Sequence, residues 1–183
     1  MELTDEHPAP TVADLLGREP QGAYEVVVVD EAGAPVVIRN APLLDDGTPM
    51  PTRYWLLGAR PRTLVGRLEA AGGVRRAERE VDAAALADAH ARYAAERDAA
   101  LPGEHAGPRP YGGVGGTRHG VKCLHAHYAW HLAGGDDPVG RWVADHLADG
   151  DGAQTDGATW RSGAESRRGE PDAEGGPTKE GQR

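Results

Sequence analysis

The order of the hydrophobic patterns constrains the fold of this chain more than any other feature. Residues 23–57 contain β-branched runs separated by turn residues, which is typical of short antiparallel strands. From Pro61 to Leu147 the apolar residues instead recur at helical spacing. Strands followed by helices, without alternation, predict an α+β fold in which a small, mainly antiparallel sheet from the N-terminal half packs with about four helices.

The individual elements follow from the same patterns. Residues 74–81 fit either an edge strand or a run into the next helix. The expected strands are residues 23–30, 36–39 and 53–57, after a short amphipathic turn at residues 11–16. The expected helices are residues 62–71, 82–100 and 121–132, and a last helix begins at Asp136 or Asp137.

The two ends of the chain differ from its centre. Residues 1–10 and 149–183 contain few apolar side chains and carry the larger part of the net charge of −9. Such segments bury too little surface to offset the entropy of ordering them. We therefore expect a disordered N-terminus at residues 1–10, a single α+β domain at residues 11–148, and a disordered acidic, glycine-rich tail at residues 149–183.

Composition also narrows the cellular setting and the partners. The central domain is nearly balanced in charge, which disfavours binding to a nucleic-acid backbone. No stretch approaches the ~18 consecutive apolar residues that cross a bilayer, and the N-terminus lacks the pattern of a signal peptide. Cys123 is the single cysteine, so it has no partner for an internal disulfide. We expect a cytoplasmic protein without nucleic-acid or membrane partners.

A glycine-rich loop at residues 112–120 precedes the helix expected at residues 121–132. Its glycines let backbone N–H groups converge on a ligand, and a helix N-terminus adds partial positive charge. The loop is not a Walker A motif, because Val121 stands where that motif has lysine. The alternative is a loop whose glycines only turn the chain. The expected ligand is a small phosphate-like anion, and the residues predicted to bind it are Gly113, Gly115, Gly116, Thr117, Arg118 and Lys122.

His119, Cys123, His127 and His131 follow one another at intervals of four residues. If the helix extends back to His119, these side chains share one face. Two neighbours in such a row can bind one divalent metal ion such as zinc. The predicted metal ligands are Cys123, His127 and His119, with a further ligand from elsewhere, such as His90. The alternative is a buried apolar cysteine beside histidines that form local hydrogen bonds.

Cys123 is also a candidate catalytic nucleophile, with His127 as its acid–base partner. In the first turn of a helix and close to basic side chains, a thiolate is favoured over a thiol. By the helical angle, His125 would point away from Cys123. Cysteine phosphatases require an arginine six residues after the cysteine, and this chain has Ala129 there.

Two further groups of residues have structural explanations that outweigh ligand binding. Arginines at positions 39, 53, 60 and 62 lie near strand ends, where a guanidinium can clamp an anion but is usually solvated. His90 lies on an apolar helix face, where a hydrogen-bonded core histidine is expected.

A long motif at residues 113–140, which begins Gly-Val-Gly-Gly-Thr-Arg-His-Gly-Val-Lys-Cys-Leu-His-Ala-His, resembles an uncharacterised actinobacterial family catalogued as domain of unknown function five hundred and one. The resemblance extends to residues 12–20, residues 51–56 and the alanine-rich helix. It implies no established activity. Members of that family are often labelled septum formation initiator family proteins. Their genes lie near the gene for an exopolyphosphatase, and this neighbourhood favours a phosphate-like ligand.

Together these features favour a cytoplasmic protein with an anion-binding loop and an adjacent Cys/His site, suited to hydrolysis or phosphoryl transfer. The sequence does not decide whether the protein is an enzyme. The alternative is a noncatalytic adaptor or regulatory protein linked to cell division, whose tail recruits a protein partner.

Overall fold

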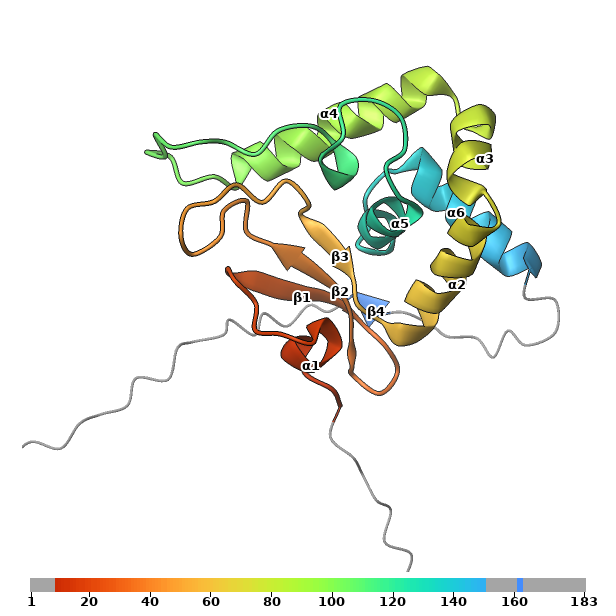
Figure 1. Cartoon of the computed structure of the whole chain (residues 1–183), viewed down its shortest axis with the longest axis horizontal. Helices are drawn as coiled ribbons and strands as arrows, with labels where there is room; N and C mark the ends of the chain where they lie inside the picture. Colours follow the sequence, from red (N-terminus) through yellow and green to blue (C-terminus); the bar gives the residue numbers. More distant parts are fainter. Residues whose placement is uncertain (1–8, 151–160, 163–183) are drawn as a thin grey trace, which may run out of the picture.

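The computed structural model describes residues 9–150 together with Arg161 and Ser162 (Figure 1). Its sheet is antiparallel and has the strand order β3-β2-β1-β4. The strands are β1 (Tyr24–Val29), β2 (Pro35–Asn40), β3 (Tyr54–Leu56) and the two-residue β4 (Arg161–Ser162). The predicted α+β class is confirmed. The ends predicted to be disordered lie mostly outside the described residues, although β4 pairs with the end of β1.

A tight turn joins β1 to β2. The Oδ1 atom of Asp30 accepts hydrogen bonds from the backbone N–H groups of Ala32 and Ala34, at 3.0 and 2.8 Å. Gly33 has a φ of 80°, a left-handed conformation that glycine adopts without strain. The turn thereby fixes the register that brings the valines of β1 opposite the apolar residues of β2.

Six α-helices and one short 3₁₀ turn lie in the described part of the chain. They are α1 (Val12–Leu16), α2 (Ala59–Ala70), α3 (Gly73–Glu80), α4 (Ala83–Ala99), η1 (Val114–Gly116), α5 (Leu124–Leu132) and α6 (Pro138–Gly150). The ambiguous residues 74–81 are therefore mostly helical. Asp82 caps α4 as predicted, because its side chain accepts a hydrogen bond from the N–H of Ala85 at 2.8 Å.

The helices cover the two faces of the sheet unequally (Figure 1). Side chains alternate across a strand, so neighbouring residues of β2 enter different clusters. Ile38 packs with Val12 and Leu57 in a small cluster beneath α1. Val37 faces the main core, which the larger helices build on the opposite face. The sheet therefore lies between one short helix and a thick helical layer.

Helix α5 lies at the centre of this helical layer, against β3, α2 and α6. Glu96 of α4 connects it to the sheet, since its carboxylate accepts hydrogen bonds from the Tyr54 hydroxyl and from Arg53 Nε. Its other oxygen accepts from Trp130 Nε1 at 3.2 Å. This network ties the C-terminal half of α5, through Trp130, to strand β3, and the candidate site lies at the other end of the helix.

Candidate functional site

The N-terminus of α5 differs from the prediction in a way that changes which side chains meet. The helix begins at Leu124, because Cys123 is its N-cap and has an extended backbone, with φ −156° and ψ 151°. His119 therefore lies outside the helix, and the predicted four-residue ladder does not share one helical face. The helical angle that separated His125 from Cys123 also does not apply, because Cys123 lies before the first helical residue.

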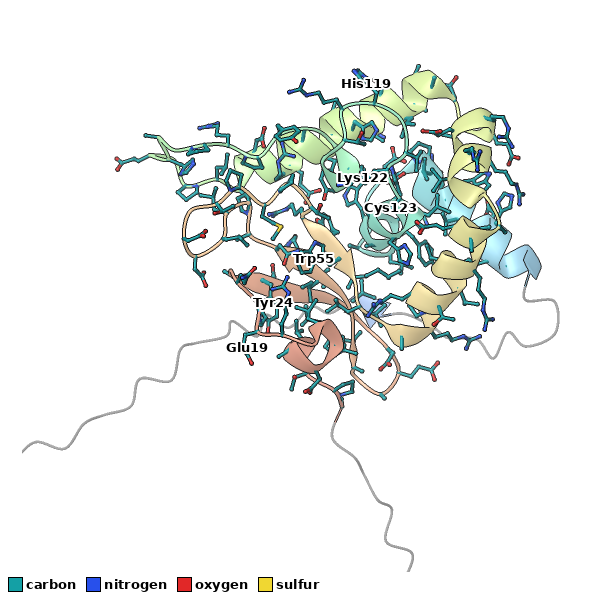
Figure 2. All side chains as sticks on the ribbon, in the orientation of Figure 1. Glu19, Tyr24, Trp55, His119, Lys122 and Cys123 are labelled. Carbon is teal, nitrogen blue, oxygen red and sulfur yellow. The ribbon has the colours of Figure 1, made fainter. Side chains whose placement is uncertain are left out.

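Cys123 and His125 both line a cleft of about 290 Å³ between β3, α1, α2 and α5. We name this hollow the Cys123 cleft. Its apolar wall includes Leu15, Leu16, Trp55 and Leu57, and Arg62 also lines it. Figure 2 shows Trp55 on the sheet and Cys123 at the beginning of α5. Both residues therefore border one hollow, although the sequence placed them on different faces of a helix.

His125 is held in this cleft by a carboxylate. Its Nδ1 atom lies 3.1 Å from Oε1 of Glu69, and its Nε2 atom lies 3.3 Å from the carbonyl oxygen of Arg62. The same Glu69 oxygen accepts a hydrogen bond from the N–H of Leu124, a first-turn donor of α5. The His125 and Glu69 side chains are 32% and 25% exposed, so both remain accessible from solvent.

The thiol of Cys123 is less ionised than the sequence suggested. Burial raises its pKa above the ordinary value for cysteine, and the negative charge of Glu69 raises it further. The backbone amides of Ala126 and His125 and the charge of Lys122 lower the pKa, but they do not outweigh burial. The expectation that the surroundings favour the thiolate is therefore wrong, although the thiol still lies at a helix N-terminus.

The glycine loop at residues 112–120 is closed on the protein itself. Hydrogen bonds run from the N–H of Gly113 to Thr117 O (2.7 Å), of Val114 to His90 Nδ1 (3.0 Å), of Gly116 to Gly113 O (2.9 Å) and of Thr117 to Val114 O (3.5 Å). Gly115 and Gly116 have φ values of 67° and 77°, as the turn alternative requires. Four donors of the predicted anion cradle are therefore already used, and anion binding by this loop stays a prediction.

The charged side chains near the loop have separate surroundings. Lys122 Nζ donates a hydrogen bond to the carbonyl oxygen of Gly115 at 3.2 Å. The Arg118 guanidinium lies 5.4 Å from the ring centre of the exposed Tyr111. His119 is exposed on the same loop (Figure 2). These side chains are exposed at the outer surface of the loop.

His127 is in the interior, away from the Cys123 cleft. Its Nδ1 atom lies 2.7 Å from Oδ2 of Asp137, and the two side chains are 1% and 0% exposed. Its ring meets that of His90 edge-on, with the centroids 5.8 Å apart. His90 forms hydrogen bonds through both nitrogens, so its predicted core role is confirmed. Cys123 and His127 thus occupy different environments.

The predicted metal set is not completed by the structure. Within residues 9–150 and 161–162, no group of three or more histidine, cysteine, aspartate or glutamate side chains is arranged to hold a metal ion. A metal at Cys123, His127 and His119 stays a prediction.

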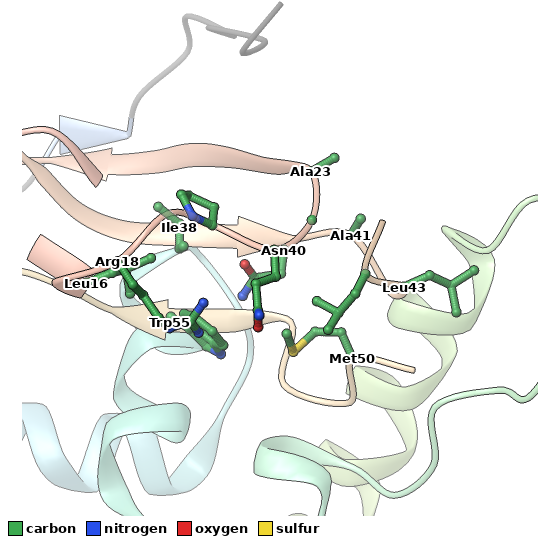
Figure 3. A pocket seen from close by; sticks show the side chains of 13 residues that line it. Leu16, Arg18, Ala23, Ile38, Asn40, Ala41, Leu43, Met50 and Trp55 are labelled. Atoms are coloured by element: carbon green, nitrogen blue, oxygen red, sulfur yellow. The ribbon is translucent and has the colours of Figure 1, made fainter. Parts of the chain in front are cut away.

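Two other hollows lie beside the sheet. The pocket in Figure 3, around Asn40 and Met50, has a volume of about 10 Å³, which is room for about one water molecule. A second, open hollow of about 360 Å³ contains Arg39 and Arg53. Arg39 is paired with Glu25, and Arg53 with Glu96. The Cys123 cleft is therefore the better candidate for a small-molecule site.

The fold and this cleft define a small α+β domain with a thiol, an imidazole–carboxylate pair and a guanidinium around one hollow. The chain belongs to the family described as a protein of unknown function (DUF501), whose model matches residues 26–145. The predicted resemblance is thereby confirmed. No curated protein and no solved structure matches the chain with significant similarity. Among the described residues, no helix is both long enough and apolar enough to cross a membrane.

Sequence reasoning missed three members of these sites. Glu69 lies in a helix for which only the apolar face was interpreted, and nothing local indicates that it meets residues more than fifty positions later. Arg62 was dismissed as a solvated arginine. Asp137 was found only as a helix cap, although its second oxygen binds His127.

Proposed function

We propose that this protein binds a small anionic molecule in the Cys123 cleft. The observation that carries the proposal is the meeting of Arg62, His125 and Cys123 around one hollow of about 290 Å³ at the N-terminus of α5. An exposed guanidinium and the partial positive charge of a helix N-terminus both favour a phosphate or carboxylate.

The shape of the cleft favours a ligand with two parts. Its apolar wall, which includes Leu15, Leu16 and Trp55, suits a hydrocarbon or aromatic group. Its polar lining suits an anion, because it includes Arg62 and His125 and because Glu69 already has hydrogen-bonding partners. A phosphate ester of an apolar or aromatic alcohol combines both parts.

The proposed chemistry is hydrolysis or phosphoryl transfer with Cys123 as the nucleophile. Nε2 of His125 exchanges its 3.3 Å contact with the Arg62 carbonyl for the thiol and takes the thiol proton. The sulfur attacks phosphorus, and the ester oxygen leaves with the proton from His125. Water then releases phosphate from the sulfur. Glu69 orients the imidazole of His125 and stabilises its charged form.

Calorimetric titration with phenyl phosphate tests the binding site. We expect Arg62→Ala and His125→Ala each to weaken binding by about tenfold or more, which corresponds to a charge-assisted hydrogen bond. Arg118→Ala is the matched control, because it removes an exposed arginine from the glycine loop and should leave the affinity unchanged. Weaker binding by Arg118→Ala, with unchanged binding by Arg62→Ala and His125→Ala, would place the anion at the glycine loop. No binding by the parent protein would refute both sites.

Mass spectrometry of the protein after acid quenching tests the chemistry. A phosphate adduct on Cys123, absent from Cys123→Ala, is expected during turnover of phenyl phosphate. Ligand binding without an adduct or released phenol would leave a binding protein and exclude the nucleophilic step for this substrate.

A noncatalytic adaptor is the second candidate. The pairing of Arg161 and Ser162 with Val29 and Val28 favours it, because a segment of the tail adds to the edge of the sheet. A purified partner that binds the full chain but not a chain lacking residues 151–183 would support this function. Equal binding by both chains would exclude the tail as the recruiting element.

A further inference from the structure

The His127 side chain contains an interior polar atom without a partner. The side chain is 1% exposed, and Nδ1 is bonded to Asp137 at 2.7 Å. Within the described part of the protein, Nε2 of His127 has no hydrogen-bonding partner. Leaving a buried polar atom in this condition is costly, so native interiors rarely contain one without a bound water or ligand.

The surroundings of Asp137 decide which nitrogen of His127 carries the proton. The Oδ1 atom of Asp137 accepts hydrogen bonds from the N–H groups of Val139 and Gly140, at 2.8 and 3.0 Å. The carboxylate is therefore the N-cap of α6 and acts as an acceptor, so Nδ1 of His127 is the donor to Oδ2. In the neutral imidazole, Nε2 is then a bare acceptor that needs a donor.

His90 cannot supply that donor. Its Nδ1 accepts a hydrogen bond from the N–H of Val114, so its proton is on Nε2 and is donated to the carbonyl oxygen of Gly120 at 3.0 Å. Burial lowers the pKa of His90, which keeps this ring neutral. Val114 is fully buried, and its N–H bonds the glycine loop to His90. The two rings thus meet where α4, α5 and the loop come together.

We propose that Nε2 of His127 binds an O–H donor at this contact, a water molecule in the resting protein, and that Asp137 and His127 together polarise it as an interior base. The bound O–H supplies the missing hydrogen bond, and Asp137 stabilises the positive charge that His127 gains as the O–H proton approaches Nε2. This site is independent of the Cys123 cleft and of its proposed ligand.

Nuclear magnetic resonance of the full chain with ¹⁵N-labelled histidine tests the proposal directly. We expect His127 to show a protonated Nδ1 and a hydrogen-bonded but unprotonated Nε2. We also expect a nuclear Overhauser contact between a long-lived water and the ring protons of His127. A protonated Nε2 in the neutral ring, or no long-lived water beside it, would overturn the proposal.

Asp137→Asn is the informative variant, and Asp136→Asn is its matched control. Asparagine keeps an oxygen for the amides of Val139 and Gly140 but presents an N–H to Nδ1, so the proton should move to Nε2 and the two nitrogen signals should exchange character. The exposed Asp136 bonds Arg141, and its substitution should leave His127 unchanged. An unchanged tautomer in a folded Asp137→Asn protein would contradict the assignment.

A metal ion is the competing occupant of Nε2. Elemental analysis of the untagged protein distinguishes the two occupants, since the proposal requires no stoichiometric metal. Two results together would overturn the proposal in favour of a metal site. The parent protein would contain a stoichiometric zinc that is lost in His127→Gln, and it would show no long-lived water beside the His127 ring.

Discussion

The glycine loop and the Cys123 cleft combine similar chemistry, yet they differ in how much of it is already in use. Both contain arginine or lysine, and both lie near the N-terminus of α5. In the loop, four backbone donors and the Lys122 ammonium are bonded within the protein. In the cleft, an exposed Arg62 and a partly exposed His125 face a hollow of about 290 Å³.

The difference shows that a glycine-rich sequence before a helix does not by itself make a ligand site. Glycines allow N–H groups to converge on a ligand, but they equally allow a loop to turn back and satisfy its own groups. What separates the two regions is whether a hollow remains beside the polar groups. The loop donors meet His90 and the loop's own carbonyls. His125 also contacts Glu69 and the Arg62 carbonyl, but it still borders an open cleft together with Arg62 and Cys123.

The largest expected effect is on the closure of the loop, through Arg97. This side chain is 1% exposed and donates to the carbonyl oxygens of Gly112, Tyr111 and Pro110. Arg97→Met removes donors from these carbonyls, so we expect the free energy of unfolding to fall by about 3–5 kcal/mol. Urea denaturation measures the change.

Arg118→Met is the control for this experiment. It removes an exposed arginine of the same loop, whose contact is the Tyr111 ring, so the expected loss is about 0.5–1 kcal/mol. Equal losses for the two variants would show that the loop is not held from the inside, and the contrast with the cleft would fail.

A smaller effect is expected from Gly113→Ala. An added Cβ atom would lie 2.4 Å from Cβ of His90, so the loop or the histidine must shift. Such overpacking costs about 1–3 kcal/mol of unfolding free energy. Gly103→Ala is the matched control, because its Cβ would meet nothing within 4 Å, and we expect a change within about 0.5 kcal/mol. A neutral Gly113→Ala would mean that the loop does not press on His90.

Much of the fold follows from local sequence signals. The valine run of β1 and the Asp82 cap of α4 each depend on neighbouring residues, so period and capping rules found them. The beginning of α5 was misplaced because Cys123 is not a typical capping residue and makes no side-chain capping hydrogen bond. Without that signal, the helical period extends back too far.

The candidate sites depend on contacts that local rules do not contain. Glu69 reaches Leu124 and His125 across more than fifty residues, and Asp137 reaches His127 from the next helix. The sequence identified most of the chemical groups, but the tertiary packing decided their partners. This explains why Cys123 was paired with His127, when the cleft brings it together with His125.

Within the cleft, Tyr54→Phe tests the network that positions α5. Tyr54 donates to Glu96, and its loss should lower the unfolding free energy by about 1–2 kcal/mol at neutral pH. Burial and the Glu96 bond raise the pKa of Tyr54 from 10.0 to about 12. Because the folded pKa lies above the unfolded one, this contribution is complete below pH 10 and is lost as the pH rises toward 12.

The phenylalanine variant should therefore lose stability less steeply than the parent between pH 10 and pH 12. Denaturation across that range measures the slope. The buried Tyr93 also has a raised pKa, so the slope should decrease without disappearing. An unchanged slope would show that Tyr54 ionises as easily in the folded state as in the unfolded state.

The smallest expected effect concerns the reactivity of Cys123 toward iodoacetamide, which reports the thiolate fraction at a fixed pH. Glu69→Gln removes a negative charge that raises the thiol pKa, so alkylation should be faster than in the parent. Lys122→Met removes a positive charge that lowers the pKa, so alkylation should be slower. Opposite changes would show that charge controls the thiol, as a nucleophile in this cleft requires. Equal changes would indicate that access to the buried sulfur limits the reaction, and Cys123 would then be a lining residue of a binding cleft.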